Sequence, residues 1–205
     1  MPDQSPVEAV GGWRGPGAMR FVELALCLLT LPIWGALVAA LAVLVRLVDG
    51  TPAFFHQERA GLGGRPFTLV KLRTMRMGEG SDAERMTRLG RVLRRTSLDE
   101  LPQLWQVVTG TMALVGPRPL PVRYLPRYTP EQMRRHAVRP GLTGWAQVNG
   151  RNGLSWAERF RQDVWYVDHR SMGLDVRIVW MTVGRVLAGR GVSADDDATM
   201  QEFHG

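Results

Sequence analysis

Two adjacent carboxylates, Asp99 and Glu100, lie inside the stretch RRTSLDELP at residues 94–102. On a helix, neighbouring side chains point about 100° apart, so the pair could hold one metal ion or one phosphate from two sides. One carboxylate could also attack an electrophile while the other holds the metal or tunes its neighbour's ionisation. On its own such a pair is more typical of a solvated helix start, an interpretation that the cations Arg94 and Arg95 just upstream weaken.

Arg118 lies between two prolines in the stretch VGPRP at residues 115–119. Proline fixes its own φ and pushes the preceding residue to extended geometry, so this arginine is presented on stiff backbone. A stiff mount suits a group that must hold a phosphate in one position. The same pattern is typical of a rigid surface turn, and the motif alone does not separate the two interpretations.

A loop rich in glycine and polar amides follows at residues 139–152, with the sequence RPGLTGWAQVNGRN. Its glycines would let the backbone approach a ligand closely. Hydrogen bonds to that ligand could come from Gln147, Asn149, Arg151 and Asn152. The stretch matches neither a Walker motif nor a dinucleotide-binding fingerprint, so by itself it does not name the ligand.

Few other residues could hold a metal. Cys27 is the only cysteine, which excludes a disulfide scaffold and a cysteine-ligated zinc site. The histidines are scattered without a metal-binding spacing. A catalytic metal would therefore be held by carboxylates, and such ligands favour Mg²⁺ or Mn²⁺.

The chain of 205 residues carries a formal net charge of +7, and Lys71 is the only lysine among its 26 basic residues. Arginine presents a rigid fork that suits phosphate, so nucleic acid, an anionic membrane surface and a phosphorylated small substrate are all suitable partners. A GC-rich genome would produce the same arginine bias, so charge alone does not choose among them. The composition excludes wholesale disorder, and the length fits one ordinary domain with an appendage.

These groups need elements to position them, and the first is an apolar run from Phe21 to Val45. It follows a tail rich in Gly, Pro and small residues and is long enough for a membrane helix, which needs about 20 residues. Pro32, near its middle, would bend the helix. Basic residues flank both ends, so the positive-inside rule gives no orientation. Composition favours a single kinked span over a hairpin that enters and leaves the same cytoplasmic face.

Beyond the apolar run, residues 52–75 are typical of a strand, a glycine turn and a second strand. Two helix capping boxes follow, Ser81–Glu84 and Ser155–Glu158. The first predicts a basic amphipathic helix for a membrane or a solvated surface, with an apolar face of Met86, Leu89, Val92 and Leu93. A last helix is expected from about residue 175 to 188.

Three blocks occur in order along the chain: KLRTM at 71–75, RRTSLDELPQLWQVVTGTMALVGPRPL at 94–120 and VRPGLTGWAQVNGRN at 138–152. Together they resemble the bacterial sugar transferase family, the small monotopic phosphoglycosyltransferases of glycoconjugate assembly. The resemblance covers nearly the whole chain. It implies an α/β, mostly helical fold with a flexible tail at 1–19 and a re-entrant membrane helix hairpin at 20–46. The cytoplasmic catalytic domain at 47–205 would carry amphipathic interfacial helices and a short β-hairpin.

The resemblance implies that a UDP-sugar gives its phosphosugar to undecaprenyl phosphate and that UMP is released. Asp99 would be the nucleophile that forms an aspartyl phosphosugar, Glu100 would be its dyad partner, and both would hold Mg²⁺ against the diphosphate. The motifs place Arg94, Arg118 and Arg151 as active-site arginines and Lys71 and Asp163 as further polar residues of the site. Gln147 and Asn149 stay candidates for substrate binding from the glycine-rich loop.

Short family members use a re-entrant helix with both ends cytoplasmic, so the resemblance reverses the preference for a single span. It places the protein at the inner (cytoplasmic) membrane as a monotopic protein with its active site on the cytoplasmic face. The family breaks this helix at a Ser-Pro pair, which would fall at Gly35 and Ala36, whereas here the proline is Pro32, one turn earlier. Thr30 is expected to replace the serine by bonding back to a carbonyl.

The implied partners are a UDP-sugar, undecaprenyl phosphate and membrane lipid, with no nucleic acid. Downstream glycosyltransferases and a homodimer through the segment around Trp180 stay open. The ending GVSADDDATMQEFHG is similar to that of PglC-like members that transfer N,N′-diacetylbacillosamine 1-phosphate. This favours an N-acetylated amino sugar, with glucose, galactose and N-acetylhexosamine as alternatives.

Two other functions compete with this one. A membrane-anchored nucleic-acid-binding protein would explain the arginines, but it leaves the Asp99–Glu100 pair unexplained. A non-catalytic partner in polysaccharide assembly would be expected to have lost some of the site residues. Asp99, Glu100, Arg118 and Arg151 are all present, which argues against it.

Overall fold

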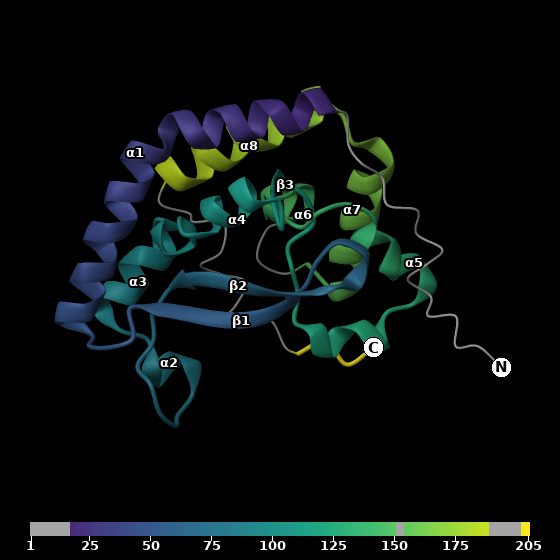
Figure 1. Cartoon of the computed structure of the whole chain (residues 1–205). Helices are drawn as coiled ribbons and strands as arrows, with labels where there is room; N and C mark the ends of the chain where they lie inside the picture. The colour runs from purple at the N-terminus through teal and green to yellow at the C-terminus, as the bar shows by residue number, and fades with distance from the viewer. Residues whose placement is uncertain (1–16, 151–153, 189–201) are drawn as a thin grey trace.

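The computed structural model describes residues 17–150, 154–188 and 202–205, and helices make up most of them (Figure 1). The α-helices are α1 (Gly17–Val48), α2 (Asp82–Arg85), α3 (Arg88–Arg95), α4 (Gln103–Thr109), α5 (Pro130–Met133), α6 (Trp145–Asn149), α7 (Trp156–His169) and α8 (Met172–Leu187). The strands are β1 (Phe54–Ala60), β2 (Pro66–Leu72), β3 (Ala113–Val115) and β4 (Gly141–Thr143). Short 3₁₀ helices are η1 (Leu62–Gly64), η2 (Leu98–Glu100), η3 (Val122–Arg127) and η4 (Arg134–Ala137).

The chain opens with α1, which is long and apolar enough to cross a membrane by length and composition. Figure 1 shows α1 changing direction near its middle, where Pro32 lies inside the helix. Proline removes one backbone hydrogen bond and crowds the preceding turn. The Thr30 hydroxyl donates to the Leu26 carbonyl at 2.7 Å, which confirms the predicted back-bonding, and the Trp34 ring nitrogen donates to the Cys27 carbonyl at 3.0 Å.

Strands β1 and β2 form an antiparallel hairpin whose register runs from Phe54 opposite Leu72 to Ala60 opposite Pro66. This confirms the predicted strand, glycine turn and strand. Gln106 of α4 covers the outer edge of β2. Its side-chain amide nitrogen donates to the Thr68 carbonyl at 2.6 Å, and its amide oxygen accepts from the Val70 backbone N–H at 3.2 Å. The hairpin is thereby tied to the helix that follows the acidic pair.

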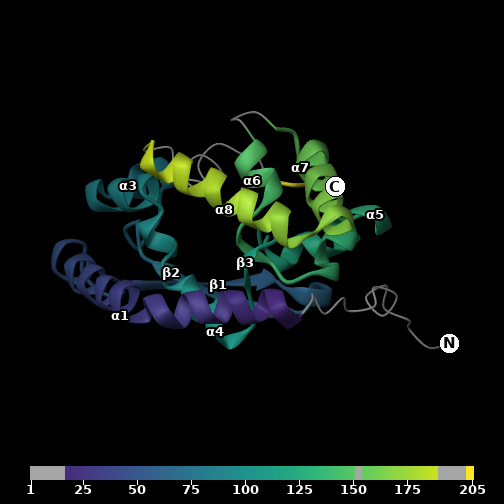
Figure 2. The same ribbon diagram turned by 90° about the horizontal axis from the view of Figure 1, so that it is seen from above.

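The short parallel pair of β3 and β4 lies at the centre of the fold, with β3 between α1 and α8 when seen from above (Figure 2). The two strands approach so closely that a Cβ at Gly141 would lie 2.1 Å from the Gly116 nitrogen, so only glycine fits there. Tyr166 links β3 to the helical layer, because its hydroxyl lies within hydrogen-bond distance of both the Val115 carbonyl, at 3.2 Å, and the Asp175 carboxylate, at 2.7 Å.

The basic amphipathic helix predicted after Ser81 is wrong as a single element. The capping box exists, but α2 ends at Arg85 and a new helix, α3, begins at Arg88 with Thr87 as its N-cap. The break arises because the intervening residue, Met86, is extended and forms a bridge with Met75. The expected faces change as well, since Val92 is exposed and Arg94 is buried.

The second capping box and the last helix are confirmed. Ser155 caps α7 with Glu158 at the third helical position, and α8 covers the range predicted for the last helix, beginning three residues earlier. The residues Tyr166 and Ile178 from these two helices pack with Val115, Val138 and Val148 in one apolar core. This core supports β3 and the segment that follows it.

Candidate functional site

The acidic pair occupies η2, directly after Ser97, which adopts the left-handed conformation with φ 56°. Among the described residues, Ser97 is the one non-glycine residue with positive φ. Such a conformation is unfavourable for a residue with a side chain, and it persists where the surroundings impose it, often at functional sites. Asp99 and Glu100 are 1% and 5% exposed, so the pair is not part of a solvated helix start.

Three cations from separate elements surround the pair. Lys71 lies near the end of β2, Arg94 lies in the last turn of α3, and Arg118 follows β3. The Arg118 Nη2 atom lies 3.1 Å from Glu100 Oε1. Burial and the neighbouring Glu100 raise the pKa of Asp99 to about 6, while the charges of Lys71, Arg94 and Arg118 act to lower it.

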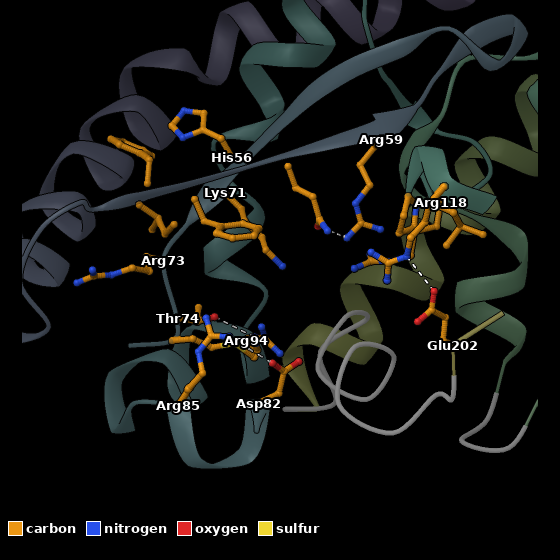
Figure 3. A pocket seen from close by; sticks show the side chains of 18 of the residues that line it. His56, Arg59, Lys71, Arg73, Thr74, Asp82, Arg85, Arg94, Arg118 and Glu202 are labelled. Carbon is orange, nitrogen blue, oxygen red and sulfur yellow. Dashed lines mark hydrogen bonds and ion pairs between the residues drawn. The ribbon is translucent and has the colours of Figure 1, made fainter. Parts of the chain in front are cut away.

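A pocket of about 670 Å³ adjoins these cations. Its lining includes Lys71, Arg94 and Arg118, and Figure 3 shows Lys71 and Arg94 extending toward the same space from opposite sides. Asp99 and Glu100 are not part of the lining; they are buried next to it. Further along, the pocket is lined by the aromatic rings of Tyr124 and Trp156, by Arg123 and by Glu202 of the C-terminal segment.

Several buried polar atoms around the acidic pair have no hydrogen-bond partner in the structure. They are Arg94 Nη1, Ser97 Oγ, Asp99 Oδ1 and Gln103 Nε2, and all belong to the stretch 94–103. A buried polar atom without a partner costs free energy, and in native proteins it is normally satisfied by a ligand, an ion or water. The cluster therefore indicates a place where a polar ligand completes the site.

The acidic pair offers few ligands for a divalent cation. Within the described ranges no group of three or more His, Cys, Asp or Glu side chains comes together. Mg²⁺ commonly binds one or two carboxylates and completes its shell with water and phosphate oxygens. The unpartnered Asp99 Oδ1 and the adjacent Glu100 fit that mode of binding, provided that a phosphorylated ligand supplies the remaining oxygens.

The segment that carries Arg118 is held along its backbone. The Pro117 carbonyl accepts from the Gly141 amide at 3.0 Å, and the Leu120 carbonyl accepts from the Ala60 amide at 2.9 Å. These bonds fix the loop to β4 on one side and to the hairpin on the other. Arg118 is thus mounted on rigid backbone, as the flanking prolines predict.

The other predicted site residues lie elsewhere. Asp163 is buried in α7, is paired with Arg135 and does not line the pocket. Gln147 is buried in α6 with neither amide atom partnered, and the exposed Asn149 donates to the Trp145 carbonyl; neither lines the pocket. Arg151 and Asn152 lie outside the described residues. The structure therefore brings together Lys71, Arg94, Asp99, Glu100 and Arg118.

Sequence reasoning missed several residues of this region. Gln103, one helical turn after Asp99, and Ser97 contribute unpartnered buried atoms, and Arg135 holds the Arg118 backbone. The positive φ of Ser97 gives no sequence signal, because Gly and Asn are the residues usually associated with it. The charged residue Glu23 inside the apolar run was a visible signal, and its side chain accepts from the Leu114 amide of β3 at 3.0 Å.

The structure thus combines a buried carboxylate pair, a cationic pocket whose charges suit phosphate, and an N-terminal helix long and apolar enough to cross a membrane. The chain belongs to the bacterial sugar transferase family, whose model matches residues 16–189. It is 46% identical over 192 residues to the uncharacterized sugar transferase EpsL of Bacillus subtilis, with 91% of this chain and 95% of that protein covered.

Two further relatives carry names that state a reaction. The chain is 42% identical over 168 residues to the UDP-glucose:undecaprenyl-phosphate glucose-1-phosphate transferase of Xanthomonas campestris, with 74% of this chain covered. It is 35% identical over 186 residues to the UDP-N-acetylgalactosamine-undecaprenyl-phosphate N-acetylgalactosaminephosphotransferase of Aeromonas hydrophila, with 84% covered. The chain spans 35% and 44% of the lengths of these two proteins.

Proposed function

We propose that this protein transfers a sugar 1-phosphate from a UDP-sugar to undecaprenyl phosphate and releases UMP. One observation carries the proposal: the buried Asp99 carboxylate has an unpartnered oxygen and lies among three cations at the edge of a pocket. Positioning and neutralisation of charge are what phosphoryl transfer requires from a protein. The names of the two relatives describe the same reaction class.

The proposed reaction has two steps. In the first, an Asp99 oxygen attacks the phosphorus that carries the sugar, the bond to the bridging oxygen breaks, and UMP leaves with the bonding electrons. In the second, an oxygen of the lipid phosphate attacks the phosphorus of the aspartyl phosphosugar. The Asp99 carboxylate is expelled unchanged, and the product is a lipid diphosphate sugar. Each step forms one bond to phosphorus and breaks one.

The cations have separate tasks in this scheme. Arg118, on its rigid loop, offers a planar fork for phosphate oxygens while it balances the charge of Glu100. Arg94 Nη1 has no partner in the structure and is free to bind a second oxygen, since its Nε is held by the Thr74 hydroxyl at 3.0 Å. Lys71 adds a positive charge near Asp99. Bound at Asp99 and Glu100, Mg²⁺ would supply Lewis-acid neutralisation of the diphosphate.

We also propose that α1 is a re-entrant helix whose bend at Pro32 leaves both of its ends on the cytoplasmic face. Large apolar side chains are exposed along both halves of α1, including Leu29 and Ile33 around the bend. α8 adds a second exposed apolar stripe at helical spacing, made of Val176, Trp180, Val183 and Leu187. In Figure 1, α8 and the first half of α1 lie along the upper side of the molecule, which suits a shared membrane surface, whereas the second half of α1 runs down the left side.

Topology is tested by labelling with a membrane-impermeant maleimide in intact cells. Cysteines are introduced one at a time as Ser5→Cys and Glu79→Cys in a Cys27→Ser background. The re-entrant proposal predicts that neither cysteine reacts until the cells are lysed. Labelling of Ser5→Cys from outside, without labelling of Glu79→Cys, would establish a single span instead. Ala36→Pro combined with Pro32→Leu, which moves the proline to the family's position, is expected to keep both sites protected.

For the donor we propose a UDP-linked N-acetylated amino sugar such as UDP-N,N′-diacetylbacillosamine. The resemblance to enzymes for that sugar lies in the C-terminal stretch, and Glu202 from this stretch lines the pocket. The relatives are named for glucose and N-acetylgalactosamine, so both belong in the donor panel together with galactose. A donor used at least tenfold faster than the rest would identify the sugar.

The reaction is tested by UMP release from purified protein in detergent or nanodiscs with Mg²⁺, undecaprenyl phosphate and each UDP-sugar. We expect lipid-dependent release from one donor, no release by Asp99→Asn, and normal release by the matched control Asp168→Asn, whose carboxylate is exposed and paired with Arg134. Wild-type turnover by Asp99→Asn would remove Asp99 as the nucleophile. If no donor gives UMP and mass spectrometry finds no phosphosugar on Asp99, the proposed activity is wrong.

A further inference from the structure

The carbonyl of Arg118 accepts a hydrogen bond from a buried side chain. Arg135, from η4, donates from Nη2 to the Arg118 carbonyl oxygen at 2.7 Å. Arg135 is 2% exposed and does not line the pocket, so it contacts the loop that carries Arg118 from the side that faces away from the pocket. The guanidinium also lies 5.6 Å from the ring centre of Phe160, which restricts its orientation further.

Arg135 is in turn fixed by Asp163 of α7. Asp163 Oδ2 accepts from Arg135 Nε at 3.1 Å and from Nη2 at 2.7 Å, and both side chains are almost fully buried. A chain of contacts therefore runs from Asp163 through Arg135 to the Arg118 carbonyl. It continues from the Arg118 guanidinium to Glu100 at 3.1 Å, next to the nucleophilic residue.

Stability alone does not account for this ion pair. Taking two charges out of water is costly, and replacing a buried pair by apolar residues of similar size is often neutral or stabilising. The contact that an apolar pair could not reproduce is the hydrogen bond to the Arg118 carbonyl. That bond fixes the loop at the residue whose side chain meets the substrate phosphates in the proposed function.

We infer that Arg135 and Asp163 are positioning residues that set the place of the Arg118 guanidinium from outside the pocket. The inference rests on the proposed function for the role of Arg118. Asp163 accordingly acts at a distance from the substrate and not as a substrate contact. Small displacements of a catalytic group reduce rates strongly, by as much as about 100-fold per ångström.

The test replaces the pair by apolar residues, Arg135→Met with Asp163→Leu, which removes the hydrogen bond without leaving a buried charge alone. Arg134→Met with Asp168→Leu is the matched control, because it removes an exposed ion pair between the same two elements. Both are made in the wild-type chain and in Arg118→Lys. If the ion pair acts through Arg118, the double substitution Arg135→Met with Asp163→Leu lowers kcat/KM about tenfold or more in the wild-type chain. In the Arg118→Lys background it lowers kcat/KM less than about twofold. Equal losses in both backgrounds would overturn the inference.

A second readout does not depend on activity. Amide hydrogen exchange is followed at Gly116, Arg118 and Leu120 and, for comparison, in α7 and the hairpin. The inference predicts at least about tenfold faster exchange in the Arg118 loop of the apolar pair variant, with the other segments unchanged. Unchanged loop exchange, or a uniform rise throughout the protein, would overturn it. If the wild-type protein releases no UMP, the proposed function fails, whereas this exchange pattern still decides the positioning role.

Discussion

Arg118 and Glu100 form an ion pair, with 3.1 Å between Nη2 and Oε1, that joins the proline-bounded loop to the residue beside Asp99. The two side chains come from segments separated by α4 and β3, and both are mostly buried. The guanidinium of Arg118 balances the negative charge of Glu100, one of the two adjacent carboxylates. Asp99, by contrast, keeps an oxygen without a hydrogen-bond partner, as the proposed nucleophile requires.

Arg118→Lys tests whether the shape of this cation matters or only its charge. Lysine keeps the charge near Glu100 but offers a point charge in place of a planar fork, so the phosphate oxygens lose a directed pair of donors. We expect kcat/KM to fall about 10- to 100-fold while the melting temperature changes little. Arg134→Lys, in an exposed ion-pair network, is the control and should behave as wild type. Full activity of Arg118→Lys would show that charge alone suffices.

Asp99→Asn should stabilise the protein at neutral pH while it abolishes turnover. The pKa of Asp99 is raised from an ordinary 3.8 to about 6, chiefly by burial, so between these values the folded state binds more protons than the unfolded state. Stability due to this group therefore falls as pH rises through that window. Asparagine removes the penalty, and we expect a gain of about 1–3 kcal/mol at pH 7 from a shift of this size.

The comparison is made by denaturant unfolding of both proteins between pH 4 and pH 8. The difference in free energy of unfolding should shrink toward low pH, because the wild-type carboxyl becomes protonated there and resembles the amide. A constant difference across this range would mean that the titration of Asp99 does not contribute. Asp168→Asn, at an exposed site, should show no such trend.

If the proposed two-step reaction is right, the rate of its first step should follow the ionisation of Asp99. Only the carboxylate is nucleophilic, so with a pKa of about 6 the reactive fraction falls about tenfold from pH 7 to pH 5. Single-turnover mixing of enzyme with donor, without lipid acceptor, measures UMP release in this step alone. A rate that stays flat down to pH 5 would mean that the carboxyl titrates well below 6 once the cations and donor surround it.

The sequence predicts local features of this fold better than long-range ones. The hairpin, both capping boxes and the last helix follow from short-range spacing, and each is confirmed. Motif blocks also placed Lys71, Arg94 and Arg118 with the acidic pair, and the structure brings these residues together. The helix predicted after Ser81 fails because Met86 bridges to Met75, a tertiary contact that periodicity does not contain.

The arginines are a second case in which the sequence does not predict long-range contacts. Net charge suggests a basic surface, yet Arg59, Arg73, Arg94 and Arg135 are all buried. Arg73, for example, donates to the carbonyls of Asp49, Gly50 and Thr51 at the end of α1. Part of the arginine excess therefore binds the protein's own backbone. Such partners lie tens of residues away, so sequence alone could not separate these arginines from ligand-binding ones.

Glu23 provides a last prediction, because a charged residue in the apolar run must have a specific partner. Its carboxylate accepts from the Leu114 amide at 3.0 Å and from Arg20 at 3.3 Å, and Arg20 donates to the Val107 carbonyl at 2.5 Å. α1 is thus joined to β3, the strand that leads to Arg118. Glu23→Gln keeps a side-chain oxygen that can accept from the Leu114 amide. Glu23→Leu removes the oxygen acceptor for both the Leu114 amide and the Arg20 guanidinium.

We therefore expect Glu23→Leu to lower the free energy of unfolding in detergent by about 1–3 kcal/mol and Glu23→Gln to lower it by less. Glu131→Leu, at an exposed position, is the control for loss of a carboxylate. In Glu23→Leu, the rate of amide exchange should rise more at Leu114 than in α7, because the lost hydrogen bond lies on the α1 side of β3 only. Equal stability of the two Glu23 variants would mean that α1 is attached through its apolar contacts with α4, and that the buried carboxylate contributes nothing to that attachment.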